Sequence, residues 1–178
     1  MNFQQELIDL LPKIEWGGSS IDDAIYEVML RVAEADRLLF IGNGGSAGIA
    51  SHMAIDWTKN GKKPALAFND CASLTAIGND LGFDKVFSFP ISMHGRRSDL
   101  LFAISSSGQS QDILDAVYAA RANGISVVTF SGFLSNNPLR REGMINFYVP
   151  SFDYGLVECC HLILNHDILN AAIGQRSD

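Results

Sequence analysis

Two segments with helical periodicity open the chain, and they differ in pattern from everything that follows. Apolar residues recur at helical spacing over residues 4–11 and again over residues 20–34, with a break at Gly17 and Gly18. Ser19 or Ser20, followed by two aspartates, supplies an N-cap for the second segment. We therefore expect an N-terminal helical hairpin.

Beyond residue 36, short apolar runs alternate with longer helical stretches. The runs are rich in β-forming side chains and cover residues 37–41, 65–68, 100–104, 126–130 and 146–149. The helical stretches cover residues 47–60, 72–79, 110–123, 137–142 and 154–172. Such alternation is typical of parallel β-α-β units, whose strands are buried on both faces. The sequence predicts an α/β fold with a doubly wound sheet of about five parallel strands flanked by helices, as one domain over residues 1–178.

Composition and charge exclude several classes of function. Hydrophobic residues make up 47% of the 178 positions, which is enough for a substantial core, and no apolar stretch is long enough to span a membrane. The first residues lack the basic and apolar regions of a signal peptide, so we expect a cytoplasmic protein without membrane contact. Thirteen Lys and Arg against twenty Asp and Glu give a net charge of −7, which disfavours nucleic acid as a partner.

The strongest chemical signal is a glycine-rich turn between a predicted strand and a helix, at residues 40–46. Glycines let the backbone approach an anion closely, and the amides at a helix start favour negative charge. The spacing of Gly42, Gly44 and Gly45 does not fit the dinucleotide-binding fingerprint, and no lysine follows to make a nucleotide P-loop. The turn indicates a phosphate-binding site, although a tight turn without a ligand gives the same pattern.

A second turn of this kind follows the predicted strand at residues 100–104. It carries Ser105, Ser106, Ser107 and Ser110 ahead of a helix. Clustered hydroxyls offer several donors to one phosphate without a cation, although a serine-rich turn alone is more often an ordinary N-cap. Because the two turns follow two strands of one sheet, together they indicate a phosphorylated small molecule.

Two pairs of ionisable side chains share helix faces. His52 and Asp56 are four residues apart in one predicted helix, and Glu158 and His166 are eight residues apart in the last one, whereas His161 points elsewhere. Two histidines and two carboxylates that converge suit zinc or a related divalent ion. Spacing alone equally allows each histidine to be a core or interface residue.

These segments together resemble the sugar isomerase (SIS) domain family, and within it the phosphoheptose isomerases, over nearly the whole chain. The resemblance rests on residues 41–46 with His52, on residues 74–83, 104–110 and 149–151, and on His161 with His166. It implies the SIS fold and an aldose–ketose isomerase that acts on sedoheptulose 7-phosphate through a cis-enediol. A non-catalytic SIS module that binds a sugar phosphate or a protein is the alternative.

The resemblance also implies which residues bind the substrate. Serines matching Ser105, Ser107 and Ser110 hold the phosphate, with Ser106 in the same turn. Residues that match Asn43, Gly44 and Ser46 line the sugar, and Asp80 matches an acid that contacts sugar hydroxyls.

Two catalytic positions differ from the family pattern. Members of the family have Glu at the position of Asp56 and Gln at that of Glu158, and they use that Glu as the base and the last histidine as the acid. We expect Asp56 to be the base and His166 the acid, with Glu158 as an alternative base or a metal ligand. The expected metal, zinc or another divalent ion, is bound by His52, Asp56, Glu158 and His166.

The resemblance also implies a tetramer, and the apolar residues of the N-terminal segment support contacts between subunits. We expect a homotetramer in which residues 1–35 serve oligomerisation and residues 36–178 form the α/β core. Leu7, Leu10 and Leu11 are the apolar residues that we expect another subunit to cover.

Overall fold

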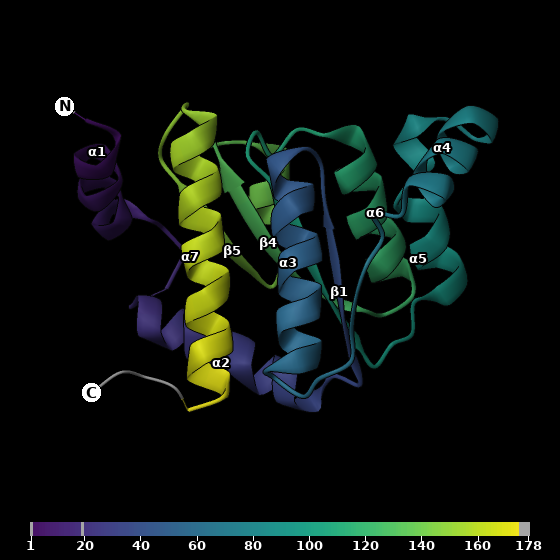
Figure 1. Cartoon of the computed structure of the whole chain (residues 1–178), viewed down its shortest axis with the longest axis horizontal. Coiled ribbons are helices and arrows are strands. Elements are labelled where there is room, and N and C mark those ends of the chain that lie inside the picture. The colour runs from purple at the N-terminus through teal and green to yellow at the C-terminus, as the bar shows by residue number, and fades with distance from the viewer. Residues whose placement is uncertain (1, 19, 175–178) are drawn as a thin grey trace.

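A five-stranded sheet forms the centre of the computed structural model, which describes residues 2–18 and 20–174 (Figure 1). Its strands are β1 (Arg37–Gly42), β2 (Ala65–Ala67), β3 (Asp99–Ser105), β4 (Ser126–Gly132) and β5 (Ile145–Val149). All neighbouring strands pair in parallel, in the order β2-β1-β3-β4-β5. The structure therefore confirms the predicted doubly wound α/β architecture.

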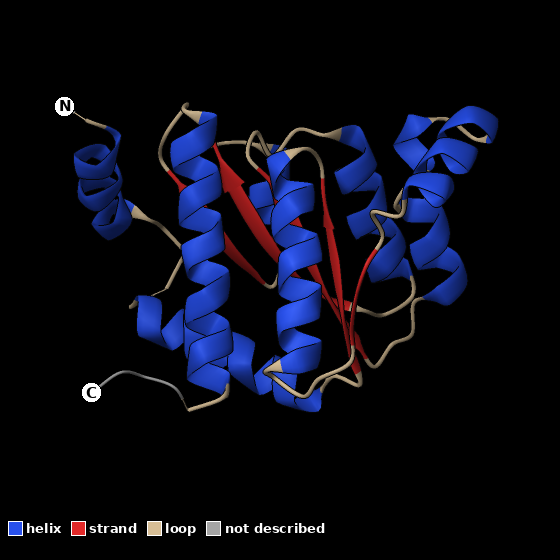
Figure 2. Cartoon of the chain, viewed as in Figure 1, coloured by secondary structure: helices blue, strands red, loops and turns tan. Residues whose placement is uncertain are grey.

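Helices cover both faces of this sheet (Figure 2). They are α1 (Phe3–Leu10), α2 (Ile21–Glu34), α3 (Gly45–Lys59), α4 (Cys71–Asp80), α5 (Ser88–His94), α6 (Gln111–Ala122) and α7 (Tyr154–Ala172). Short 3₁₀ turns lie at Leu11–Lys13, Phe83–Lys85 and Pro138–Arg141. Helices α2, α3 and α7 pack on one face, and α5 and α6 pack on the other. Among the described residues, no helix is long and apolar enough to cross a lipid bilayer.

Alternate strand residues supply two apolar cores. In β1, Phe40 faces the core under α3 and α7, whereas Leu39 faces the core under α5 and α6. On the first face, the rings of Phe40, Phe102, Phe130 and Phe147 stack across neighbouring strands, with centroids 4.7, 6.3 and 5.2 Å apart. Burial of both faces explains why these strands appear in the sequence as unbroken apolar runs.

Two helical segments differ from the prediction. Residues 137–142 contain the 3₁₀ turn Pro138–Arg141 instead of an α-helix, and the Asn137 side chain caps it by accepting from the Arg140 amide. Because β5 begins at Ile145, the connection has room for little more than one turn. Helix α5 was not predicted, since its seven residues are too few to show a helical period.

The two N-terminal helices are present, but they are not packed along each other. Helix α1 lies beside the upper part of α7 in Figure 1, and α2 passes the lower end of α7. The segment between them, which contains Gly17 and Gly18, makes an antiparallel bridge from Glu15 to Tyr148 beside β5. The predicted hairpin is thus opened by a connection that extends along the sheet edge.

The apolar residues that we expected to face another subunit pack within their own chain. Leu10 is buried, so the expectation was wrong for this residue, whereas Leu7 and Leu11 pack against the first core and are only partly buried. The exposed large apolar residues of α1 are Phe3 and Ile8 instead. The N-cap of α2 is Ser20, whose hydroxyl accepts from a backbone amide in the first turn, while Ser19 lies outside the described residues.

Candidate active site

The two predicted phosphate-binding turns enclose one pocket. They follow β1 and β3, which are adjacent and pair Gly42 with Ile104, so the turns lie side by side at the carboxyl edge of the sheet. The pocket has a volume of about 220 Å³ and is lined by Asn43, Gly44, Gly45, Ser46, Ile104, Ser105, Ser106, Ser107, Ser110, Tyr154 and Glu158. All predicted substrate-binding residues except Asp80 therefore meet at one place.

The serine hydroxyls of this pocket differ in their hydrogen bonds. The Ser105 Oγ accepts from the Gly108 amide at 3.2 Å and lies 3.2 Å from the Ser110 Oγ, while the Ser107 Oγ accepts from a backbone amide of the turn. The Ser106 Oγ is buried and has no hydrogen-bond partner within residues 2–18 and 20–174. A buried hydroxyl without a partner costs roughly 1 to 3 kcal/mol. Ser106 is therefore the donor of this turn that gains most from a ligand.

A carboxylate from α7 lies beside the start of α3, in the same pocket. Gly44 turns the chain into α3 with a φ of +54°, in the left-handed region that glycine adopts at least cost. The Glu158 carboxylate of α7 then lies so close to Gly45 that any side chain at position 45 would collide with it. The carboxylate therefore lies beside the first turn of α3, on the pocket side of that helix.

Asp112 and Tyr154 also belong to this region, and neither was predicted from the sequence. Asp112, at the start of α6, is buried and accepts a 2.7 Å hydrogen bond from the Asn43 Nδ2. Burial raises the pKa of Asp112, while the bond from Asn43 and the amides at the helix start act in the opposite direction. The available signal was a carboxylate two residues after Ser110 in the first turn of a helix. Tyr154 lines the pocket from the first turn of α7 and offered no pattern in the sequence.

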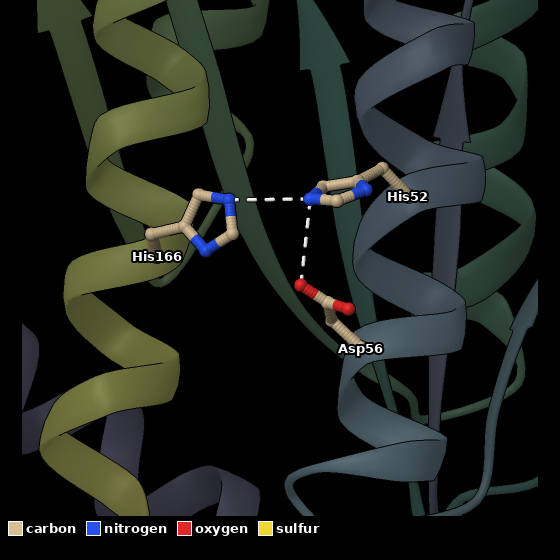
Figure 3. A group of neighbouring side chains, drawn as sticks. All are labelled: His52, Asp56 and His166. Carbon is tan, nitrogen blue, oxygen red and sulfur yellow. Dashed lines mark hydrogen bonds and ion pairs between the residues drawn. The ribbon is translucent and has the colours of Figure 1, made fainter. Parts of the chain in front are cut away.

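A second group of side chains lies between α3 and α7 (Figure 3). The His52 Nε2 is 3.3 Å from the His166 Nε2 and 3.4 Å from the Asp56 Oδ2. One ligand atom from each of the three residues lies within 4.8 Å of the others, so the group can hold a metal ion. In a tetrahedral zinc site with ligands about 2.1 Å from the metal, neighbouring ligand atoms are about 3.4 Å apart. Both observed separations fit that geometry.

Glu158, the fourth predicted metal ligand, is not part of this group. It lines the serine pocket and also a neighbouring pocket of about 350 Å³ that His52 lines. Glu158 thus lies between the serine turn and the histidine pair. Asp56 lines neither pocket.

Two other residues on which the family resemblance rests, Asp80 and His161, lie apart from the pocket. Asp80 is exposed at the end of α4, where its carboxylate accepts from the Asn79 side chain at 2.7 Å. His161 is fully buried, with its Nε2 3.2 Å from the Ser131 carbonyl oxygen. Burial lowers the pKa of His161 to about 4, which makes it a neutral core residue.

The fold and the pocket define a class of protein, and comparison with known sequences agrees with it. The SIS domain family matches residues 2–132, and the chain belongs to this family. Within the family it is a phosphoheptose isomerase-like enzyme. The phosphoheptose isomerase of Rhodospirillum rubrum is 32% identical over 170 residues, covering 92% of this chain and 90% of the relative. The phosphoheptose isomerase of Campylobacter concisus is 35% identical over 173 residues, which cover 93% of this chain and 87% of that relative.

Solved structures give the same result. The phosphoheptose isomerase of Neisseria gonorrhoeae superposes with a TM-score of 0.79 at 30% sequence identity, and the alignment covers 96% of this chain and 91% of that one. Because the match extends over nearly all of both chains, it includes α7, which lies beyond the region that the family match covers.

Proposed function

We propose that this protein is a phosphoheptose isomerase, which converts sedoheptulose 7-phosphate into the aldose heptose 7-phosphate through a cis-enediol. The similarity to phosphoheptose isomerases over most of both chains supports this substrate. The single observation that carries the proposal is one pocket that joins a serine turn, with an unpartnered buried hydroxyl, to a carboxylate.

The serine turn is the phosphate end of the proposed site. Ser105, Ser106, Ser107 and Ser110 lie at the start of α6, and the N-terminus of a helix favours an anion. The phosphate gives the Ser106 hydroxyl a partner that the protein alone does not supply. Asn43, Gly44 and Ser46 line the remainder of the pocket and bind the sugar.

Glu158 is the base in this proposal. It lines the pocket that the serines line, whereas Asp56 does not line it and has its Oδ2 3.4 Å from the His52 Nε2. The Glu158 carboxylate removes the proton from C1, next to the C2 carbonyl of the ketose, and returns it to C2 of the cis-enediol. The proton of the C1 hydroxyl passes to the C2 oxygen in the same conversion, so the aldose has the composition of the ketose. We had expected Asp56 in this role, and the geometry supports the alternative.

The His52, Asp56 and His166 group is the proposed metal site. Two imidazoles and one carboxylate are a common ligand set of catalytic zinc, and they leave a fourth position open. When bound, zinc would polarise the oxygens of the substrate's reacting carbons. A histidine that binds metal is not free to act as an acid, so this proposal assigns His166 to the metal and not to proton transfer.

We further propose that the chain acts as a homotetramer, with residues 1–35 at the subunit contacts and residues 36–178 as the catalytic core. The exposed side chains of Phe3 and Ile8 on α1 support an interface there.

The test is an incubation of the purified protein with sedoheptulose 7-phosphate, with and without added zinc, followed by analysis of the sugar products. We expect the aldose heptose 7-phosphate to form, and we expect no turnover of unphosphorylated sedoheptulose. If a panel of ketose phosphates raises the melting temperature but none is turned over under either condition, the protein is a non-catalytic SIS module.

A further inference from the structure

A polar pair joins one lining residue of the serine pocket to a buried carboxylate outside the lining. Asp112, the second residue of α6, is 4% exposed and does not line the pocket, whereas Asn43 does. The Asn43 Nδ2 donates to the Asp112 Oδ2 at 2.7 Å, although the two residues are 69 positions apart. The pair therefore ties the glycine-rich turn after β1 to the helix that follows the serine turn.

The chemistry of the two side chains fixes how the amide of Asn43 is oriented. An ionised carboxylate only accepts hydrogen bonds, so Asn43 must present its NH₂ group to Asp112. The carbonyl oxygen Oδ1 of the same amide is then turned away from Asp112. An asparagine with a neutral partner can present either atom, because a second amide or a hydroxyl both donates and accepts.

The start of α6 supports the ionised form of Asp112. The carboxylate occupies the first turn of the helix, where the backbone amides of Asp112 and Ile113 favour its negative charge. Burial has the larger effect and raises the pKa of Asp112, and the short bond from Asn43 and these amides offset part of that rise.

We propose that Asp112 is a positioning residue that makes Asn43 a hydrogen-bond acceptor in the pocket, so that the site selects a sugar phosphate with a hydroxyl group where Asn43 reaches it. The inference rests on the proposed function, because it requires a sugar phosphate in this pocket. The serines hold the phosphate separately, so Asp112 acts on recognition of the sugar and not of the phosphate.

The first test separates these two parts of the ligand. In Asp112→Leu the amide of Asn43 loses its fixed orientation, and we expect the KM for sedoheptulose 7-phosphate to rise roughly tenfold, which is the loss of one hydrogen bond. The inhibition constant of inorganic phosphate should stay within about twofold of wild type. Asp115→Asn, which removes a carboxylate from the same helix outside the pocket, is the matched control and should change neither value. If the KM for the sugar phosphate and the inhibition constant of inorganic phosphate rise by the same factor, Asp112 merely supports the helix, and the inference is overturned.

An exchange of the two side chains gives a second test. Asn43→Asp alone puts two carboxylates at hydrogen-bond distance, which repel each other, so sugar phosphate binding should weaken roughly tenfold. Adding Asp112→Asn restores one amide and one carboxylate, with the carboxylate now facing the sugar as an acceptor. We expect this double variant to recover most of the affinity that Asn43→Asp loses. A double variant no better than Asn43→Asp overturns the inference.

The outcomes distinguish this inference from the proposed function. If wild type binds sedoheptulose 7-phosphate by calorimetry but does not turn it over, the isomerase proposal fails and the same variants are judged by their dissociation constants. If wild type is active and Asp112→Leu leaves the KM unchanged, only the inference on Asp112 fails. If wild type binds no sugar phosphate, both fail.

Discussion

The Nε2 atoms of His52 and His166 lie 3.3 Å apart, although 114 positions separate the two residues in the chain. They meet because α3 and α7 pack on the same face of the sheet and turn these side chains toward each other (Figure 3). Asp56, one helical turn after His52, adds a carboxylate on the same side. This contact between helices places the proposed metal site next to the pocket that Glu158 lines.

Metal removal tests this site directly. Chelation should abolish isomerisation and lower the melting temperature, since a metal at 100 times its Kd stabilises the folded state by about 2.7 kcal/mol. His52→Ala and His166→Ala should each lose bound zinc as measured by atomic emission. His94→Ala, at the end of α5, serves as the control and should retain it. Unchanged zinc content in the two site variants would contradict the assignment.

The choice of base is tested by two amide substitutions. Glu158→Gln should lower kcat by about 100-fold or more with little change in KM, because it keeps the shape and removes the basicity. Asp56→Asn should lose activity together with its metal. If Asp56→Asn is inactive while fully loaded with metal, and Glu158→Gln is active, then Asp56 is the base as the family pattern implies. The double variant Asp56→Glu with Glu158→Gln recreates the family arrangement and should be active only in that case.

Ser106→Ala should make the free protein more stable and the phosphate complex weaker. The substitution removes a buried hydroxyl without a partner, so we expect about 1 kcal/mol of added stability in urea unfolding. It also removes a phosphate donor, so binding of inorganic phosphate should weaken roughly tenfold. Ser107→Ala is the comparison, because its hydroxyl already accepts a backbone amide and its loss should not stabilise the protein. A less stable Ser106→Ala variant would count against this interpretation.

His161 should make the stability of the protein depend on pH. Its folded pKa of about 4 lies below the unfolded value of 6.5, so between these values only the unfolded chain binds the proton. The stability contributed by neutral His161 is complete above pH 6.5 and falls by about 3 kcal/mol as the pH drops to 4. His161→Gln removes this titration, so the difference in unfolding free energy between variant and wild type should shrink as the pH falls. A constant difference would refute the prediction.

Light scattering tests the proposed tetramer. Wild type should have the mass of four chains, and Ile8→Asp should reduce it, because a charge at an exposed apolar position of α1 disfavours burial in an interface. Tyr118→Asp, at an exposed position of α6, is the matched control. Wild type with the mass of a monomer at micromolar concentration would exclude the tetramer.

The strands and long helices could be predicted because their signals are local. The apolar run over residues 37–41 became β1 (Arg37–Gly42), and the periodic segment over residues 154–172 became α7 with the same bounds. The serine and glycine turns were predictable for the same reason, since each follows directly on a strand. Helix α5 and the 3₁₀ turn at Pro138–Arg141 were not, because in segments this short packing decides more than pattern.

The position of Glu158 shows that residue spacing along a helix does not establish whether two side chains reach the same site. Glu158 and His166 share a helix face, as predicted, but eight residues correspond to about 12 Å along a helix. Helix α7 therefore places Glu158 in the serine pocket and His166 beside His52. The pairing of Asp112 with Asn43 was likewise inaccessible, since it depends on how two turns from different strands approach each other.

Helix α7 also determines when the protein can fold during synthesis. Its side chains Leu156, Val157 and Cys160 join the core that contains Phe130 and Phe147 on one face of the sheet. A nascent chain that has emerged only as far as β5 carries β1 to β5 and both proposed phosphate-binding turns, but it lacks the α7 side chains that pack in the core with these rings. We therefore expect such chains to need chaperone protection, and α7 to complete the hydrophobic core and the proposed catalytic site in a single step.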